Sequence, residues 1–139
     1  FDASLPRKIF AGADIILMPS KYEPGGIVAL EAQGYGCVPL VRATGGLADS
    51  VIDFDPQTNS GTGFSFKNFS GMSFLVALVR ALETYKNPTV WKGIIRRAMQ
   101  QDFSWDHAAQ RYLDLYSRAV EFRKLALLPN PPPAFREIE

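Results

Sequence analysis

The stretch that decides the fold runs from Asp14 to Ala43 and reads DIILMPSKYEPGGIVALEAQGYGCVPLVRA. Residues 14–20 and 37–43 contain apolar runs of strand length, and apolar residues recur at helical spacing between them, in residues 27–36. A continuous apolar run of this length is typical of a strand that is covered on both faces, as in a parallel sheet. The stretch therefore predicts a strand–helix–strand unit with a right-handed crossover.

The same alternation continues on both sides of this unit. Apolar spacing, caps and turns predict short helices at 4–13 and 47–53, a third strand at 63–66, and longer helices at 72–86, 89–101 and 105–124. Because strands alternate with helices, the sheet should be parallel. Three strands are about half the number in a doubly wound nucleotide-binding domain.

The fold class expected from this pattern is α/β: the second half of a Rossmann-like parallel-sheet domain, followed by C-terminal helices. We expect this domain to occupy residues 1–128 and a proline-rich tail to occupy residues 129–139. The chain lacks an initiator Met and begins inside an organised pattern, so we expect a fragment or an excised domain.

Composition narrows the classes of function. The chain has 139 residues, and 15 Lys and Arg oppose 14 Asp and Glu, for a net charge of +1. Such a balance gives no electrostatic case for nucleic acid or a membrane surface as a partner. Every apolar run is shorter than the roughly 18 residues that a membrane span needs. A reducing, cytoplasmic setting is the simplest expectation.

The single cysteine, Cys37, precedes the apolar run 38–41 and is predicted to be a small buried hydrophobic residue. A cysteine nucleophile needs a base nearby, and the lone histidine, His107, is distant in sequence. One cysteine and one histidine do not make a zinc site either, so no metal centre is expected.

Two glycine-containing turns follow the predicted strands. Glu23-Pro24-Gly25-Gly26 leads from the first strand into a helix that carries Glu31, and Thr44-Gly45-Gly46 leads from the second strand into the next helix. In open α/β sheets, ligands bind at the carboxyl edge of the strands. Glycines let the backbone approach a ligand, and a helix N-terminus presents unpaired N–H groups and a partial positive charge that suit a phosphate.

The two carboxylates suggest what else such a ligand carries. Glu23 and Glu31 repel a phosphate, but each can accept two hydrogen bonds from a vicinal diol, and a nucleotide sugar has diols on its ribose and its sugar. A structural interpretation fits the same residues: Glu23 as a turn acid favoured by the helix dipole, Glu31 as a partly exposed helix residue, and Gly45-Gly46 as a tight turn. The glycine spacing matches neither a dinucleotide fingerprint nor a P-loop.

Longer stretches carry a family resemblance. Residues 13–53, with GTGFSF, RALETYKNPTVWKGIIRRAM and DFSWDHAAQRYLDLY further on, resemble the C-terminal domain of bacterial glycogen synthases and plant starch synthases. These are retaining glycosyltransferases of the two-Rossmann-domain, GT-B type. The E-x7-E spacing is shared by many such enzymes, whereas TGGLADSV and DFSW are more specific to the glucan synthases. The resemblance covers the chain from about Ala13 to Tyr116.

The resemblance implies a role for each matching position. Glu23 takes the catalytic position and contacts hydroxyls of the donor glucose. The implied donor-binding positions are Pro24 in the same turn, the backbone amides of Gly25, Gly26 and Ile27 at the phosphates, Glu31 near the ribose, and Thr44, Gly45 and Gly46 beside the diphosphate and glucose. Gly25 departs from many relatives, which carry cysteine there, but backbone amides do not need that side chain. The family uses no metal and no cofactor.

The resemblance also implies a reaction and its partners. Glucose would pass from ADP-glucose or UDP-glucose to the non-reducing end of an α-1,4-glucan, with retention. The family's diphosphate-binding Arg and Lys, its Lys-Thr-Gly-Gly-Leu loop and its catalytic His lie in earlier sequence, which includes the N-terminal GT-B domain. We therefore expect this chain alone to be inactive, and its parent to be cytoplasmic in a bacterium or plastidial in a plant.

Two alternatives stay open on the residues alone. The first is another retaining GT-B glycosyltransferase, one that makes sucrose, trehalose or a lipid-linked sugar. The second is a non-catalytic glucan-binding or regulatory module that uses the same fold.

Overall fold

The computed structural model describes residue 2 and residues 4–127. The chain divides into two compact units, Phe1–Gln101 and Asp102–Glu139. The proline-rich tail expected at 129–139 lies outside the described residues. None of the helices in the described part is long and apolar enough to cross a membrane.

The first unit is built on a parallel sheet. Within the described residues this sheet has three strands, in the order β1 (Ile15–Met18), β2 (Val38–Arg42) and β3 (Phe64–Phe66). β1 pairs with β2 from Ile15 opposite Val38, and β2 pairs with β3 from Leu40 opposite Phe64. The predicted α/β fold with a parallel sheet is therefore confirmed.

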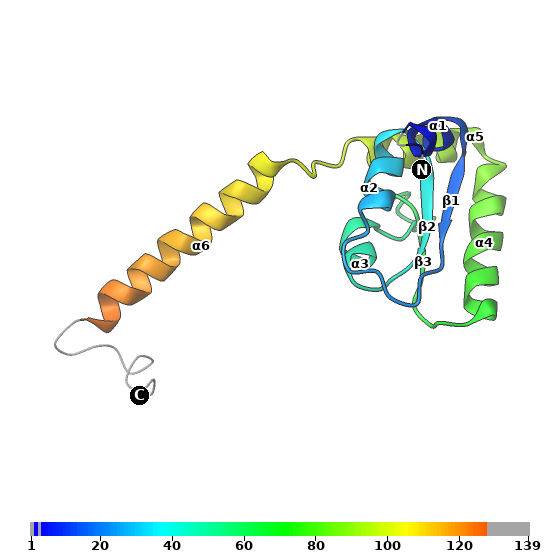
Figure 1. The fold of residues 1–139 in the computed structure, drawn as a ribbon. Helices are drawn as coiled ribbons and strands as arrows, with labels where there is room; N and C mark the ends of the chain where they lie inside the picture. The colour runs from blue at the N-terminus through cyan, green and yellow to red at the C-terminus, as the bar shows by residue number, and fades with distance from the viewer. Residues whose placement is uncertain (1, 3, 128–139) are drawn as a thin grey trace. The chain divides into compact units, whose positions relative to one another are not determined.

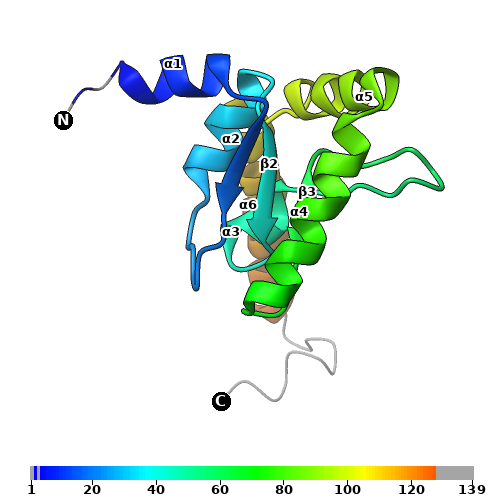
Figure 2. The same cartoon turned by 90° about the vertical axis from the view of Figure 1, so that its right-hand side faces the viewer.

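Helices lie on both faces of this sheet. The first unit contains α1 (Leu5–Gly12), α2 (Ile27–Gly34), α3 (Gly46–Ser50), α4 (Gly71–Tyr85) and α5 (Pro88–Met99). Figure 1 shows α2 and α3 on one side of the strands and α4 on the other. Figure 2 shows α1 and α5 near the amino ends of the strands, away from the arrowheads. β1, and β2 as far as Val41, are apolar, as expected where helices cover both faces of a sheet. The polar strand residues are Arg42, at the end of β2, and Ser65 in β3.

Pro39 lies in β2, the central strand, although proline usually avoids that position. The N–H of Val38 donates to the carbonyl oxygen of Asp14, on the β1 side, at 3.0 Å. Successive backbone N–H groups point to opposite sides of a strand, so the nitrogen of Pro39 faces β3. Pairing with β3 begins only at Leu40. The missing N–H therefore removes no hydrogen bond from the ladder.

The main core of the first unit lies between the sheet, α4 and α5. Phe64 in β3 is fully buried, and its ring stacks on that of Trp91 in α5 with 6.0 Å between centroids. The ring of Phe54 lies 5.8 Å from that of Phe64. This aromatic cluster holds the third strand and the helical layer together.

The second unit contains one helix, α6 (Trp105–Ala126), of 22 residues among those described. The rings of Tyr112 and Tyr116, one turn apart on this helix, have centroids 6.1 Å apart. Gln110 donates a hydrogen bond to the carboxylate of Asp114 at 3.2 Å. Such pairs at helical spacing support α6 locally.

Candidate functional site

The structure brings the two glycine turns together at the carboxyl edge of the sheet. The first turn, Glu23–Gly26, follows β1, and the second, Thr44–Gly46, follows β2. The backbone N–H of Gly46 donates to the carbonyl oxygens of Glu23, at 3.1 Å, and Pro24, at 3.2 Å. The turns are therefore joined backbone to backbone.

This close approach explains why both residues of the second turn are glycines. A β-carbon on Gly46 would lie 2.9 Å from the Cα of Gly25, and one on Gly45 would lie 3.0 Å from the carbonyl carbon of Glu23. Real β-carbons do not approach backbone atoms so closely. Gly45 also has a φ of 49°, a backbone conformation that residues other than glycine rarely adopt. Any side chain here would push the two turns apart.

Glu23 is half-buried, and its carboxylate turns back onto its own loop. Oε1 accepts hydrogen bonds from the N–H of Gly26 at 3.1 Å and from that of Gly25 at 3.4 Å. Gly26 is the N-cap residue of α2 and has a φ of 69°. Because it is a glycine, it has no side chain that could cap the helix. Glu23 accepts from the N–H of this N-cap residue itself, and no side chain caps the N–H groups inside α2. In this structure it therefore holds two of the amides that the resemblance assigns to the donor phosphates.

An open hollow of about 470 Å³ lies at this turn. Its lining residues are Glu23, Pro24, Gly25, Gly26, Ile27 and Val28. Five of the nine residues singled out in the sequence therefore border one space. That space lies at the start of α2, where the helix dipole is positive.

Glu31 does not line this hollow, but it lies on the same face of α2. It follows Ile27 by four residues, which places it one helical turn, or about 6 Å, further along that face. Ile27 is 67% exposed, and Glu31 is exposed as well. Thr44, the first residue of the second turn, is half-buried. The two carboxylates therefore do not share one space: Glu23 lies in the loop before α2, and Glu31 lies on an exposed face of the helix.

Cys37 takes no part in this edge. It is fully buried at the amino end of β2, and burial, with a smaller contribution from the carboxylate of Asp14, raises the pKa of its thiol to about 11. A thiol with that pKa stays protonated at neutral pH, so the predicted interpretation as a buried hydrophobic residue is confirmed. The described residues contain no group of three His, Cys, Asp or Glu side chains that could hold a metal ion.

Comparison with known proteins identifies the family. A family model described as glycosyl transferases group 1 matches residues 3–97. The chain belongs to this family. A glycogen synthase from Syntrophotalea carbinolica is 52% identical over 121 residues, which are 87% of this chain and 25% of that protein. The chain thus spans about a quarter of the length of the curated relatives that it matches.

Solved structures give the same family and the fold. The catalytic domain of starch synthase IV from Arabidopsis thaliana, bound to ADP and acarbose, has a TM-score of 0.76 at 38% identity and covers 87% of this chain and 25% of that one. A sucrose-phosphate synthase from Thermosynechococcus elongatus has a TM-score of 0.61 at 26% identity, covering 87% of this chain and 29% of that one. The predicted relationship to glycogen and starch synthases and the predicted GT-B fold class are confirmed.

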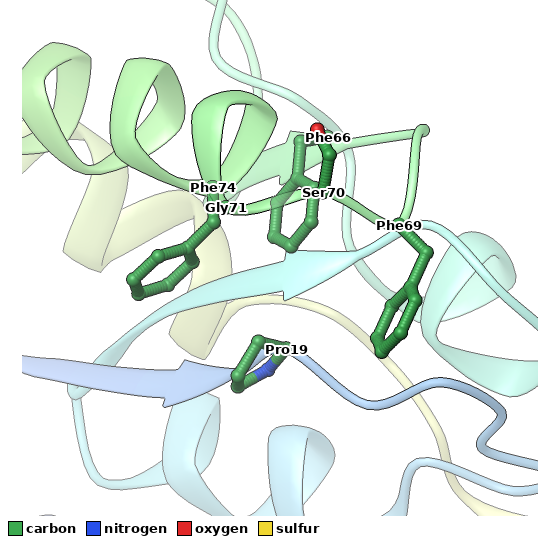
Figure 3. A pocket seen from close by; sticks show the side chains of 6 residues that line it. All are labelled: Pro19, Phe66, Phe69, Ser70, Gly71 and Phe74. Carbon is green, nitrogen blue, oxygen red and sulfur yellow. The ribbon is translucent and has the colours of Figure 1, made fainter.

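This glycosyl transferase domain also carries an aromatic pocket at the same edge, formed by residues outside both predicted turns. The pocket, of about 300 Å³, is lined by Pro19, Phe66, Phe69, Ser70, Gly71 and Phe74. Figure 3 shows the three phenylalanine rings of the β3–α4 segment facing Pro19 at the end of β1. The sequence signal was that Phe66, Phe69 and Phe74 fall within nine residues, counted from the last residue of the third strand.

Arg42 was missed as well. It ends β2, two residues before the second turn, and its guanidinium donates hydrogen bonds to backbone carbonyl groups of segments 20–21 and 67. The sequence did carry a signal for Arg42: it is a cation at the end of a buried strand, and a charge in that position needs partners. Which carbonyls it would meet depends on the tertiary structure.

Proposed function

We propose that this chain supplies part of the donor site of a glucan synthase. In the proposed reaction, glucose passes from ADP-glucose or UDP-glucose to the non-reducing end of an α-1,4-glucan, with retention. The glycogen synthase relatives and the starch synthase neighbour, whose structure is bound to ADP and acarbose, support this proposal. The proposed activity is that of the complete gene product, in which an N-terminal GT-B domain would be the partner of this one.

One observation carries the proposal: the start of α2 borders a hollow, with Glu23 beside it and the Gly45–Gly46 backbone packed behind the same turn. Amides at a helix N-terminus favour a diphosphate. In the proposed complex, the diphosphate takes over the N–H groups of Gly25 and Gly26, and Ile27 adds a third. Glu23 releases them, because its charge repels the phosphates, and turns to hydroxyls of the glucose.

The same arrangement accounts for stabilisation of the leaving group. As the glycosidic bond to the donor phosphate breaks, negative charge grows on the diphosphate. Fixed N–H dipoles at the start of α2 lie where that charge develops, which is the kind of interaction that lowers a barrier. We place the ribose along the exposed face of α2, within reach of Glu31. In the proposed complex, Thr44, Gly45 and Gly46 lie behind the turn that binds the diphosphate and glucose.

The test uses the complete gene product with Glu23→Gln and a matched control, Glu83→Gln, which neutralises an exposed carboxylate that pairs with Lys86 on α4. ADP-glucose and UDP-glucose are each supplied with a maltooligosaccharide acceptor, and both nucleotide release and chain length are followed. We expect elongation at the non-reducing end, a loss of about 100-fold or more in kcat for Glu23→Gln, and no change for Glu83→Gln.

Several outcomes would replace this proposal. Transfer only to sucrose precursors, trehalose precursors or a lipid acceptor would indicate another retaining GT-B enzyme. Calorimetry that detects maltooligosaccharide binding without ADP or UDP binding would indicate a glucan-binding module. Full activity of Glu23→Gln would remove Glu23 from the catalytic position.

A further inference from the structure

Arg42 joins its own strand to two segments that are far apart from it in the sequence, 20–21 and 67–69. Its Nε donates to the carbonyl oxygen of Ser20 at 2.9 Å, its Nη1 donates to that of Lys67 at 3.2 Å, and its Nη2 donates to that of Lys21. The guanidinium carbon also lies 5.5 Å from the centre of the Phe69 ring. A planar guanidinium presents its N–H donors in a fixed geometry. Three carbonyl groups bound to one guanidinium therefore hold fixed positions relative to one another.

The segments that Arg42 joins are the ones that lead into the candidate site. Ser20 and Lys21 lie between β1 and the Glu23–Gly26 turn, and Lys67 directly follows β3. The turn itself is held at its other end, where Gly46 donates to the carbonyl oxygens of Glu23 and Pro24. Segment 20–26 therefore has one anchor on each side, and Arg42 is the anchor on the β1 side.

We propose that Arg42 is a positioning residue for the donor site: by holding the carbonyls of Ser20 and Lys21, it fixes where Glu23 and the N–H groups of Gly25 and Gly26 lie. This inference rests on the proposed function, because the ligand of the fixed turn is the nucleotide-sugar donor proposed above. Arg42 need not touch the ligand, since each of its three nitrogens is engaged with a carbonyl. A lysine keeps the charge but lacks the planar fork, so it cannot bind all three carbonyls in the same way.

The first test compares kinetics of the complete gene product with Arg42→Lys and Arg42→Met. We expect the KM for the nucleotide-sugar donor to rise by about tenfold or more in both variants, because a small misplacement of binding groups is costly. The KM for the glucan acceptor should stay within about twofold. A merely destabilised enzyme would show a smaller active fraction, which lowers the apparent kcat but leaves the KM of the remaining active enzyme unchanged.

Arg80→Met is the matched control. Arg80 also donates to a backbone carbonyl, that of Phe54 at 2.8 Å, pairs with Asp53 at 3.1 Å, and lies over the Phe64 ring at 5.8 Å. Its partners belong to segment 53–54 and not to the candidate turn. We expect this variant to lose stability while its donor KM is unchanged.

The second test needs no activity. Hydrogen exchange followed by mass spectrometry on the chain should show amides of residues 22–26 exchanging about tenfold or more faster in Arg42→Met, with those of α5 unchanged. In Arg80→Met, faster exchange should appear around residues 53–55 instead. Unchanged exchange at 22–26 in Arg42→Met would overturn the anchoring role.

The two tests also separate this inference from the proposed function. If the wild type uses neither nucleotide sugar, the proposed function fails, and the donor-site role of Arg42 fails as well. Hydrogen exchange still decides whether Arg42 anchors residues 20–26. If the wild type transfers glucose and both Arg42 variants keep the donor KM within about twofold, the positioning role fails and the function stands.

Discussion

Gly46 donates its backbone N–H to the carbonyl oxygen of Glu23 at 3.1 Å, so the residue that we propose for the catalytic position is held by a residue of the neighbouring turn. The bond joins two loops that are separated by a whole helix and strand in the sequence. It forms only because neither Gly45 nor Gly46 has a side chain to keep the loops apart. The candidate site is therefore as much a packing arrangement as a set of polar groups.

Replacing Gly46 by alanine should destabilise the first unit. The added β-carbon would overlap the backbone of Gly25, and backbone atoms cannot move aside as a flexible side chain can. Overpacking of this kind costs about 1–3 kcal/mol. Urea unfolding of the chain, followed by circular dichroism, measures the loss in the free energy of unfolding.

The matched control is Gly34→Ala, at the last residue of α2, where an added β-carbon meets nothing within 4 Å. Removing a helical glycine should stabilise the chain by up to about 1 kcal/mol. Equal effects of the two substitutions would show that the turns are not packed as described.

Phe64→Ala should strongly destabilise the first unit. The side chain is fully buried and its ring packs against those of Trp91 and Phe54. Truncating a buried phenylalanine costs about 3–5 kcal/mol. Met72→Ala is the control, because Met72 is 70% exposed on α4 and should change stability by less than about 0.5 kcal/mol. The urea midpoints of both variants check this, and a small effect at Phe64 would contradict the core described.

Cys37 gives a prediction about pH. Burial raises the pKa of its thiol from an ordinary value of 9.0 to about 11 in the folded chain. Between these values the unfolded chain has lost the proton and the folded chain has kept it, so the free energy of unfolding falls as pH rises. The contribution of Cys37 is complete below pH 9 and is lost on the way to about pH 11.

The comparison variant is Cys37→Ala, which lacks the titrating group. Between pH 8 and about pH 11 the wild type should lose roughly 2 kcal/mol more stability than this variant, since one pKa unit corresponds to about 1.4 kcal/mol. A thiol reagent at pH 8 should also label Cys37 only after unfolding. Rapid labelling of the native chain would show that the thiol is not buried.

Much of the fold could be predicted because burial on two faces leaves few choices. Apolar runs such as residues 14–20 become strands of a parallel sheet, and the helices between them must cross over it. The ends were less predictable. The helix expected at 47–53 ends at Ser50, because Val51 is extended and the carbonyl oxygen of Ile52 accepts from Thr62 and Gly63, in a loop ten residues away. No local sequence pattern predicts such a contact.

The candidate site was predictable in its backbone but not in its side chains. Both turns follow parallel strands, and this alone places them at one edge. The carboxylate of Glu23 binds an amide of its own turn, and Arg42 binds carbonyls more than 20 residues away. Both contacts depend on side-chain rotamers that the tertiary structure selects. Sequence spacing carries no information about those choices.

The position of Glu23 predicts opposite effects on product and donor. Its carboxylate competes with a diphosphate for the N–H groups of Gly25 and Gly26 and repels the phosphate charge. If the proposed function holds, Glu23→Gln in the complete gene product should bind ADP about 3- to 10-fold more tightly, since a weakened competing hydrogen bond is worth about 1 kcal/mol. The same variant should bind the sugar nucleotide no better than the wild type, because a neutral amide binds the glucose hydroxyls less strongly than a carboxylate does.

Calorimetry with ADP and with a non-hydrolysable nucleotide sugar measures both affinities. Weaker ADP binding by Glu23→Gln would mean that the carboxylate does not compete with the diphosphate, and the amides of the turn would then need another assignment.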